Sequence, residues 1–155
     1  MTDPLGVWSD TQVSKARILV MEDDDSVSAA IQGMLVCLGY EAVLASDSNQ
    51  GVEALESSSF DLVLIDIFIP GTDGLKTIKE LRERMPSIPI VAMSGFRVRN
   101  SMNPTLDFLG MAVQLGATGS LRKPFTLQQL TAAIHAGLNP AFTGGRAPGV
   151  NRQQG

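Results

Sequence analysis

Short apolar runs alternate along the chain with segments of helical period, beginning at Arg17. The runs contain few polar residues, which is typical of parallel strands covered on both faces. Each run is followed by apolar residues spaced three or four positions apart, which indicates an amphipathic helix. Five such pairs predict an α/β fold with a parallel sheet between helices. The expected strands are Arg17–Met21, Glu41–Ala45, 60–66 (FDLVLID), 88–94 (IPIVAMS) and a short one within 116–122 (GATGSLR).

The helical segments also carry start and stop signals. Small polar side chains cap the first turn of a helix, and glycine or proline commonly follows its last turn. The first expected helix has an apolar stripe from Val27 to Leu38 and ends at Gly39, and the second is capped by Asp47 or Ser48 and contains Val52 and Leu55. The third runs from Leu75 to Met85, before Pro86, and the fourth runs from about Pro104 to Leu115. The fifth is capped by Thr126 and reaches Leu138.

A length of 155 residues favours one domain, which we place at residues 16–138. Residues 1–15 show no periodicity and are expected to be a flexible extension. Residues 139–155 are rich in glycine and proline and are expected to be a disordered tail. The 17 residues after Leu138 are too few for a DNA-binding or catalytic domain, so we expect a stand-alone domain with no attached effector.

Composition excludes several classes of function. The net charge of −4 disfavours general attraction to nucleic acid. No apolar run approaches the roughly 18 residues that a membrane helix needs, and the first residues lack the pattern of a signal peptide. The single cysteine, Cys37, cannot form an internal disulfide and fits a reducing compartment. We therefore expect a cytoplasmic protein without a membrane partner.

Four consecutive carboxylates, residues 22–25, follow the first expected strand. Neighbouring like charges repel by roughly 1 kcal/mol per pair even in water, so something must compensate them. In an open parallel sheet, ligands bind at the carboxyl ends of the strands. Asp66, Ser94 and Lys123 stand at other strand ends and would share that pocket. Carboxylates in this number suit Mg²⁺, and a central carboxylate beside a metal and an ammonium can act as a nucleophile toward a phosphoryl group.

The chain resembles the receiver domain of two-component response regulators. The resemblance covers residues 16–138 and is carried by ILVMEDD, DLVLIDIFIPGTDG, VAMSG and RKPF, in that order. It implies a doubly wound (βα)5, flavodoxin-like three-layer sandwich, with a five-stranded parallel sheet in the order 2-1-3-4-5. It also implies the site: Asp66 as phosphoacceptor, Ser94 and Lys123 as partners of the phosphoryl oxygens, a cis bond before Pro124, and Mg²⁺ bound by Asp23 and Asp66 directly, by Glu22 through water and by the backbone carbonyl of Phe68.

The implied function is that of a phosphorylated switch in a two-component or phosphorelay system. A sensor histidine kinase or a histidine phosphotransfer protein would donate the phosphoryl group. Output would follow by contact with a downstream protein or by onward transfer, from a monomer or weak homodimer. The chain would not be an enzyme beyond catalysing its own phosphorylation and slow dephosphorylation. The alternative is a receiver-like interaction module that takes no phosphate.

Three departures from the family pattern carry information. Ser120 occupies the position of the usual switch aromatic, so output through such a ring is in doubt. Residues 95–103 form part of an unusually long connection, which we expect to respond to phosphorylation or to bind a partner. Phe68 and Phe96 each stand two positions after a site residue. The resemblance implies that side chains at these two positions flank the path of the hydrolytic water. Bulky apolar groups cannot orient water, so we expect slow self-dephosphorylation.

Other residues and folds have simpler interpretations. Asp24 and Asp25 are expected to cap the following helix and complement its dipole rather than bind metal. His135 has no acidic neighbour in the sequence and is not expected to carry phosphate. A haloacid-dehalogenase-like phosphatase would need an aspartate where Phe68 stands. A flavodoxin-like carrier would need a first loop that accepts an anion, which EDDDSVS would repel.

Overall fold

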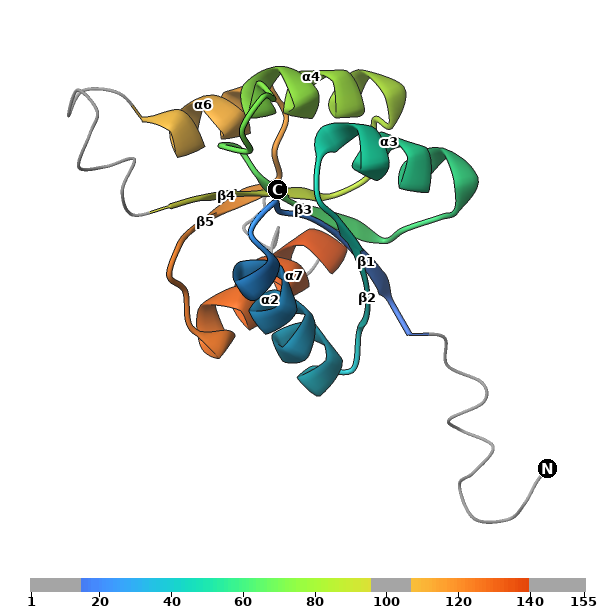
Figure 1. The fold of residues 1–155 in the computed structure, drawn as a ribbon, viewed down its shortest axis with the longest axis vertical. Coiled ribbons are helices and arrows are strands. Elements are labelled where there is room, and N and C mark those ends of the chain that lie inside the picture. The colour runs from blue at the N-terminus through green and yellow to red at the C-terminus, as the bar shows by residue number, and fades with distance from the viewer. Residues whose placement is uncertain (1–14, 96–106, 140–155) are drawn as a thin grey trace, which may run out of the picture.

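The computed structural model describes residues 15–95 and 107–139, within which five strands and five helices alternate (Figure 1). Predictions for the N-terminal extension up to residue 14, for Phe96 and most of segment 95–103, and for the tail from residue 140 lie outside these residues. The elements are β1 (Arg17–Met21), α2 (Asp25–Cys37), β2 (Glu41–Ala45), α3 (Ser48–Ser57), β3 (Leu62–Asp66), α4 (Gly74–Arg84), β4 (Ile90–Ser94), α6 (Phe108–Leu115), β5 (Gly119–Arg122) and α7 (Leu127–Leu138).

The five strands form one parallel sheet in the order β2-β1-β3-β4-β5, which confirms the expected fold class. β3 lies at the centre, and all five of its residues are buried, as its continuous apolar run predicts. Two strands begin later than expected. β3 begins at Leu62 rather than residue 60, and β4 begins at Ile90 because Pro89 before it has no N–H for the ladder.

Two layers of helices cover the sheet. Helices α3, α4 and α6 lie on one face, and α2 and α7 lie on the other (Figure 1). The strands supply both layers, because successive side chains of a strand point to opposite faces. Leu19 and Met21 of β1 join the core cluster beneath α3, α4 and α6, whereas Ile18 and Val20 join the cluster beneath α2 and α7. An unbroken apolar strand is therefore what this sandwich requires.

A polar side chain caps the start of every described helix. Each cap accepts a hydrogen bond from a backbone N–H of the first turn, which would otherwise lack a partner. The sequence predicted caps at Asp24 or Asp25 for α2, at Asp47 or Ser48 for α3 and at Thr126 for α7. Asp24, Asp47 and Thr126 are confirmed, and Thr126 forms a full capping box with Gln129. The five caps are Asp24, Asp47, Asp73, Asp107 and Thr126.

Helix α6 begins later than the sequence indicated. We expected a start near Pro104, but the helix begins at Phe108. The reason is that Asp107 is the N-cap residue, and its carboxylate accepts from the Gly110 N–H at 2.9 Å. The apolar periodicity could not distinguish this start, because it continues through both positions.

Arg82 of α4 ties the end of that helix to the end of α6. Its guanidinium donates to the Gly116 carbonyl oxygen from Nε at 3.0 Å and from Nη2 at 2.8 Å. It also donates to the carbonyl oxygens of Met85 and Pro86. Burial lowers the pKa of Arg82. Its fixed fork of donors satisfies carbonyls that the two helices leave free.

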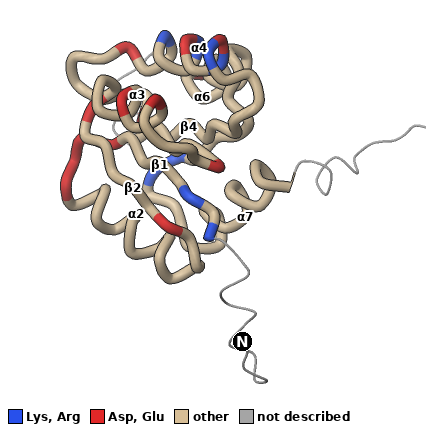
Figure 2. Tube along the Cα trace, turned by 90° about the vertical axis from the view of Figure 1, so that its right-hand side faces the viewer, with Lys and Arg blue, Asp and Glu red and all other residues tan. Residues whose placement is uncertain are grey.

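Charged residues of both signs are interleaved along α4, as Figure 2 shows.

Among the residues that the structure describes, no helix has the length and apolar character to cross a bilayer.

Candidate functional site

The candidate site lies at the carboxyl edge of the sheet, where four neighbouring strands end. Glu22 and Asp23 follow β1, and Asp66 is the last residue of β3. Ser94 ends β4 and Lys123 follows β5. Because the strands are parallel neighbours, side chains separated by up to 101 positions along the chain meet at this edge. The structure thus brings together the residues that the sequence analysis placed at the carboxyl ends of the strands.

Three carboxylates form the acidic part of the site. One oxygen from each of Glu22, Asp23 and Asp66 lies within 4.8 Å of the other two. Glu22 and Asp66 are buried, whereas Asp23 is exposed. Oxygen donors of this kind match a hard divalent cation, which accepts one or two carboxylates and keeps several waters. The donor set therefore fits Mg²⁺, with Asp23 on the side open to solvent.

Lys123 bridges the two buried carboxylates. Its Nζ donates to Glu22 Oε1 at 2.6 Å and to Asp66 Oδ2 at 2.9 Å. Its backbone N–H donates to the Ser94 carbonyl oxygen at 2.7 Å, which fixes the root of the side chain. One ammonium faces three carboxylates, so the ionised site keeps two net negative charges that a divalent cation would balance.

Burial and the ion pair together shift the pKa values of Glu22 and Lys123. Desolvation raises the pKa of Glu22, the hydrogen bond from Lys123 opposes it, and the nearby charge of Asp66 adds to it. Desolvation alone would lower the pKa of Lys123, but its hydrogen bonds to Glu22 and Asp66 and their charges outweigh that effect and raise it. Lys123 is therefore held as an ammonium, while burial disfavours the ionised form of Glu22.

The next two acids serve helix α2, as the sequence predicted. The carboxylate of Asp24 caps the helix by accepting from the Val27 N–H at 3.0 Å. Asp25 lies in the first turn, where its charge complements the helix dipole. The backbone N–H of Asp24 also donates to Glu22 Oε2 at 3.2 Å, which helps to orient Glu22. The run of four acids thus divides into two site residues and two helix residues.

Phe68 belongs to the loop that follows Asp66. Its backbone N–H donates to Asp66 Oδ1 at 2.9 Å. Both oxygens of Asp66 are therefore engaged, one by Phe68 and one by Lys123. The ring of Phe68 contacts the ring of Phe108 in α6, which the sequence analysis did not anticipate. The role of the Phe68 carbonyl as a metal ligand stays a prediction.

The remaining sequence candidates separate into those at the site and those away from it. Ser94 is buried beside Lys123, and the Lys123–Pro124 bond is cis, as the resemblance implied. Ser120 is exposed on β5, so no ring stands at that position. His135 is exposed in the last turn of α7, away from the strand ends.

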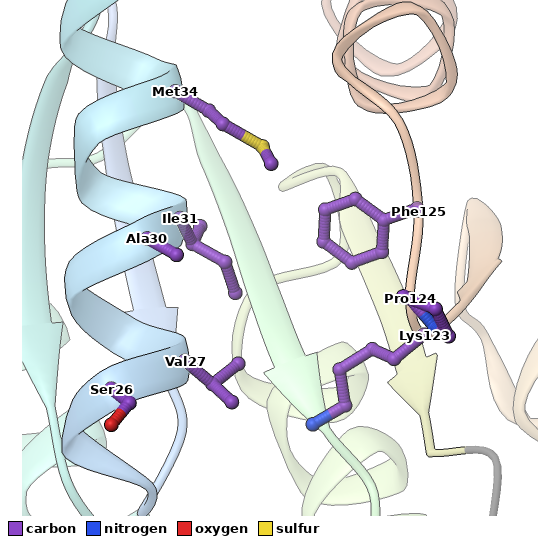
Figure 3. A pocket seen from close by; sticks show the side chains of 8 residues that line it. All are labelled: Ser26, Val27, Ala30, Ile31, Met34, Lys123, Pro124 and Phe125. Atoms are coloured by element: carbon purple, nitrogen blue, oxygen red, sulfur yellow. The ribbon is translucent and has the colours of Figure 1, made fainter.

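An apolar groove opens next to the site. It lies between α2 and the segment that follows β5, and it encloses about 390 Å³. Figure 3 shows Ile31 and Met34 facing Phe125 across it, with Lys123 at one end. The apolar stripe of α2 does not by itself predict this groove, because it does not show that Ala30 is exposed and Met34 only partly buried. The lining residues are Ser26, Val27, Ala30, Ile31, Met34, Lys123, Pro124 and Phe125.

Residues 18–135 match the family described as the response regulator receiver domain. The chain belongs to this family. The receiver domain is 36% identical over 118 residues to the transcriptional regulatory protein DltR of Streptococcus agalactiae serotype III (strain NEM316), across 76% of this chain and 50% of DltR. It is 32% identical over 121 residues to the transcriptional regulatory protein ZraR of Escherichia coli (strain K12), across 78% of this chain and 26% of ZraR. It thus spans half or less of these relatives.

Solved structures show the same fold. A response regulator receiver domain protein from Clostridium thermocellum matches with a TM-score of 0.71 and 27% identity, covering 83% of this chain and 98% of that one. A CheY-like receiver domain protein from Methanospirillum hungatei JF-1 matches with a TM-score of 0.73 and 23% identity, covering 84% and 98% of the two chains, which bears on the fold alone. The chain is therefore a receiver domain of two-component signalling.

Proposed function

We propose that this receiver domain is a switch phosphorylated on Asp66 in a reaction that depends on Mg²⁺. The donor is a phosphohistidine of a sensor histidine kinase or of a histidine phosphotransfer protein. The phosphorylated domain then contacts a downstream protein or passes the group onward. The observation that carries the proposal is the meeting of three carboxylates with the ammonium of Lys123 at one edge of the sheet.

The chain offers a complete set of metal donors. Asp23 and Asp66 would bind Mg²⁺ directly, Glu22 would bind it through water, and the Phe68 carbonyl would complete the protein ligands. When bound, Mg²⁺ offsets negative charge on the carboxylates and on the phosphoryl oxygens. Glu22 is buried and its pKa is raised, so a nearby cation favours its ionised form.

Asp66 acts as the nucleophile. One of its carboxylate oxygens forms a bond to phosphorus while the bond from phosphorus to the donor imidazole nitrogen breaks. The electron pair of that bond returns to the imidazole, which takes a proton from solvent, and Asp66 becomes an acyl phosphate. Lys123 and the Ser94 hydroxyl then hold phosphoryl oxygens, which requires Lys123 to give up its bond to Asp66 Oδ2.

The phosphorylated state should persist. Phe68 follows Asp66 by two positions, and its ring can neither accept a proton from water nor orient it. We therefore propose slow self-dephosphorylation and no turnover of another substrate.

The groove beside Lys123 suits the phosphoryl donor. It is lined mainly by apolar side chains and reaches the residue whose ammonium contacts Asp66. A helix with an apolar stripe can lie in such a groove and bring a histidine to the strand ends. The net charge of −4 favours a protein partner over nucleic acid. We further propose a cytoplasmic location, which the single cysteine fits, and a monomer or weak homodimer.

Intact mass spectrometry after treatment with acetyl phosphate and Mg²⁺ tests the proposal. We expect one phosphoryl group on the wild type and none on Asp66→Asn. Asp25→Asn is the matched control, because Asp25 belongs to the same acidic run but serves α2. Candidate kinases labelled on histidine should transfer to the wild type and to Asp25→Asn only. A wild type that stays unmodified would instead identify an interaction module that takes no phosphate.

A further inference from the structure

An aromatic pair joins the phosphoacceptor loop to helix α6. The rings of Phe68 and Phe108 meet edge to face, with centroids 5.1 Å apart and planes at 82°. Phe108 is the first residue of α6, and both rings pack partly buried against the same core cluster. This is a favoured geometry for two aromatic rings, so the contact contributes beyond the area it buries.

The main chain of Phe68 connects the same contact to Asp66. The Phe68 N–H donates to Asp66 Oδ1 at 2.9 Å, a hydrogen bond to an ionised acceptor. Phosphorylation turns one carboxylate oxygen into the bridging oxygen of an acyl phosphate and changes the charge that this N–H faces. A change at Asp66 therefore acts directly on the residue whose ring touches α6.

Strand β5 has Ser120 at the position where the family usually has an aromatic ring. Ser120 is small and exposed, and it lines a shallow groove with Gln129 and Ala133 of α7. It cannot move an aromatic group in response to Ser94. The Phe68–Phe108 pair, by contrast, lies between the loop of Asp66 and the helix that packs on β4 and α4.

We propose that Phe108 is a positioning residue of the phosphoacceptor site, whose ring holds Phe68 and couples the loading of Asp66 to the first turns of α6. The inference rests on the proposed phosphorylation of Asp66 and adds the route by which that state leaves the site. Coupling between two positions is reciprocal, so Phe108 must also affect the affinity of the site for its ligand.

The test compares the wild type with Phe108→Leu, which removes the ring, and Phe108→Tyr, which keeps it. Phe60→Leu is the matched control, because Phe60 packs against the same cluster but precedes β3 at the other end of that strand. Beryllofluoride with Mg²⁺ serves as the phosphoryl probe. Fluorine NMR measures its occupancy and affinity, and amide hydrogen exchange of residues 109–112 measures the response of α6.

An edge-to-face pair corresponds to roughly a 2- to 12-fold change in an equilibrium constant. In the wild type, Phe108→Tyr and Phe60→Leu, we expect beryllofluoride to change exchange in α6 by a factor in that range. In Phe108→Leu at full occupancy, the change in α6 exchange should fall below about twofold. The affinity for beryllofluoride should shift by the same factor by which this exchange response decreased.

A full α6 response in Phe108→Leu, or no response in a loaded wild type, overturns the inference while leaving phosphorylation intact. A shift in affinity without loss of the helix response also overturns it, because reciprocity would fail. Failure of the wild type to bind beryllofluoride, seen directly by fluorine NMR, overturns the proposed function and the inference with it. Thermal unfolding of each variant checks that the fold is retained.

Discussion

The ammonium of Lys123 lies closer to Glu22 than to Asp66, at 2.6 Å from Oε1 against 2.9 Å from Oδ2. Glu22 follows the first strand and Lys123 follows the last, so this ion pair closes the site across the sheet. When an oxygen of Asp66 is taken up by phosphorus, Lys123 keeps a partner in Glu22. The pair therefore lets the ammonium move between acceptors without becoming an unpaired buried charge.

The stability of the domain without metal should depend on pH through Glu22. Its pKa is raised in the fold, chiefly by burial, so its contribution to stability is complete below about pH 4.5 and is lost as the pH rises through the folded-state pKa. Relative to Glu22→Gln, the wild type should lose stability with rising pH, by at most about 1.4 kcal/mol per pH unit. Urea unfolding of both proteins in EDTA measures this difference. A gain with rising pH would contradict the assignment, and added Mg²⁺ should reduce the loss.

Phe68→Asn should speed loss of phosphate from Asp66. An amide that orients the attacking water through one hydrogen bond worth about 1.4 kcal/mol raises the rate roughly tenfold. Phe68→Leu removes the ring without adding a polar group, so it separates this effect from loss of the contact with Phe108. Decay of the labelled protein measures both rates. Slower decay in Phe68→Asn, or equal acceleration in both variants, would show that the ring does not act by excluding an oriented water.

Ala30→Arg should slow phosphotransfer from a histidine donor, because a long charged side chain would fill the apolar groove. A central contact of this kind changes affinity by roughly 1–2 kcal/mol, or about 5- to 30-fold. Val36→Arg is the control, since Val36 is exposed on the same helix but does not line the groove. Labelling by acetyl phosphate should be the same in both variants. Equal transfer rates from the kinase would place the donor elsewhere on the domain.

Arg82→Lys should lower the free energy of unfolding by about 1–2 kcal/mol, because lysine cannot donate two parallel hydrogen bonds to the Gly116 carbonyl. Arg84→Lys on the same helix should change it by less than about 0.5 kcal/mol, since its ion pair with Glu56 is exposed. Urea unfolding compares the two. Equal losses would mean that the fork of Arg82 contributes no more to stability than an exposed arginine on the same helix.

Two glycines should respond oppositely to alanine. A methyl group at Gly74 would collide with backbone atoms of Ile67, the residue after Asp66, so Gly74→Ala should destabilise the fold by about 1–3 kcal/mol. Gly33 lies within α2 and has open space around it, so Gly33→Ala should stabilise by about 0.5–1 kcal/mol. Thermal unfolding measures both changes. Stabilisation by Gly74→Ala would show that the loop after β3 gives way easily.

The residues at the strand ends could be read from the sequence because one rule places them. An apolar run that stops at a polar residue marks the carboxyl end of a parallel strand, and that end is where ligands bind. Asp66 and Ser94 follow from this rule once their strands are recognised. Asp24 likewise follows from helix chemistry, since a carboxylate before a helical stripe satisfies a free N–H.

Other features depend on distances that the sequence does not contain. The contact of Phe68 with Phe108 joins segments 40 positions apart, and neither residue belongs to a motif that predicts the other. The start of α6 depended on whether Asp107 or an earlier residue supplied the cap. An apolar stripe also cannot show which of its members reach solvent, so the sequence does not reveal that Ala30 and Met34 line a groove.

The five helix caps described above all lie at the carboxyl edge of the sheet, because each helix follows a parallel strand. Every described helix therefore directs the partial positive charge of its first turn toward the side that holds Glu22, Asp23 and Asp66. These peptide dipoles offset part of the negative charge that exposed carboxylates such as Asp23 place at this edge. The repeated order of strand and helix thus makes this edge of the sheet more favourable for a phosphoryl group than its number of carboxylates alone would indicate.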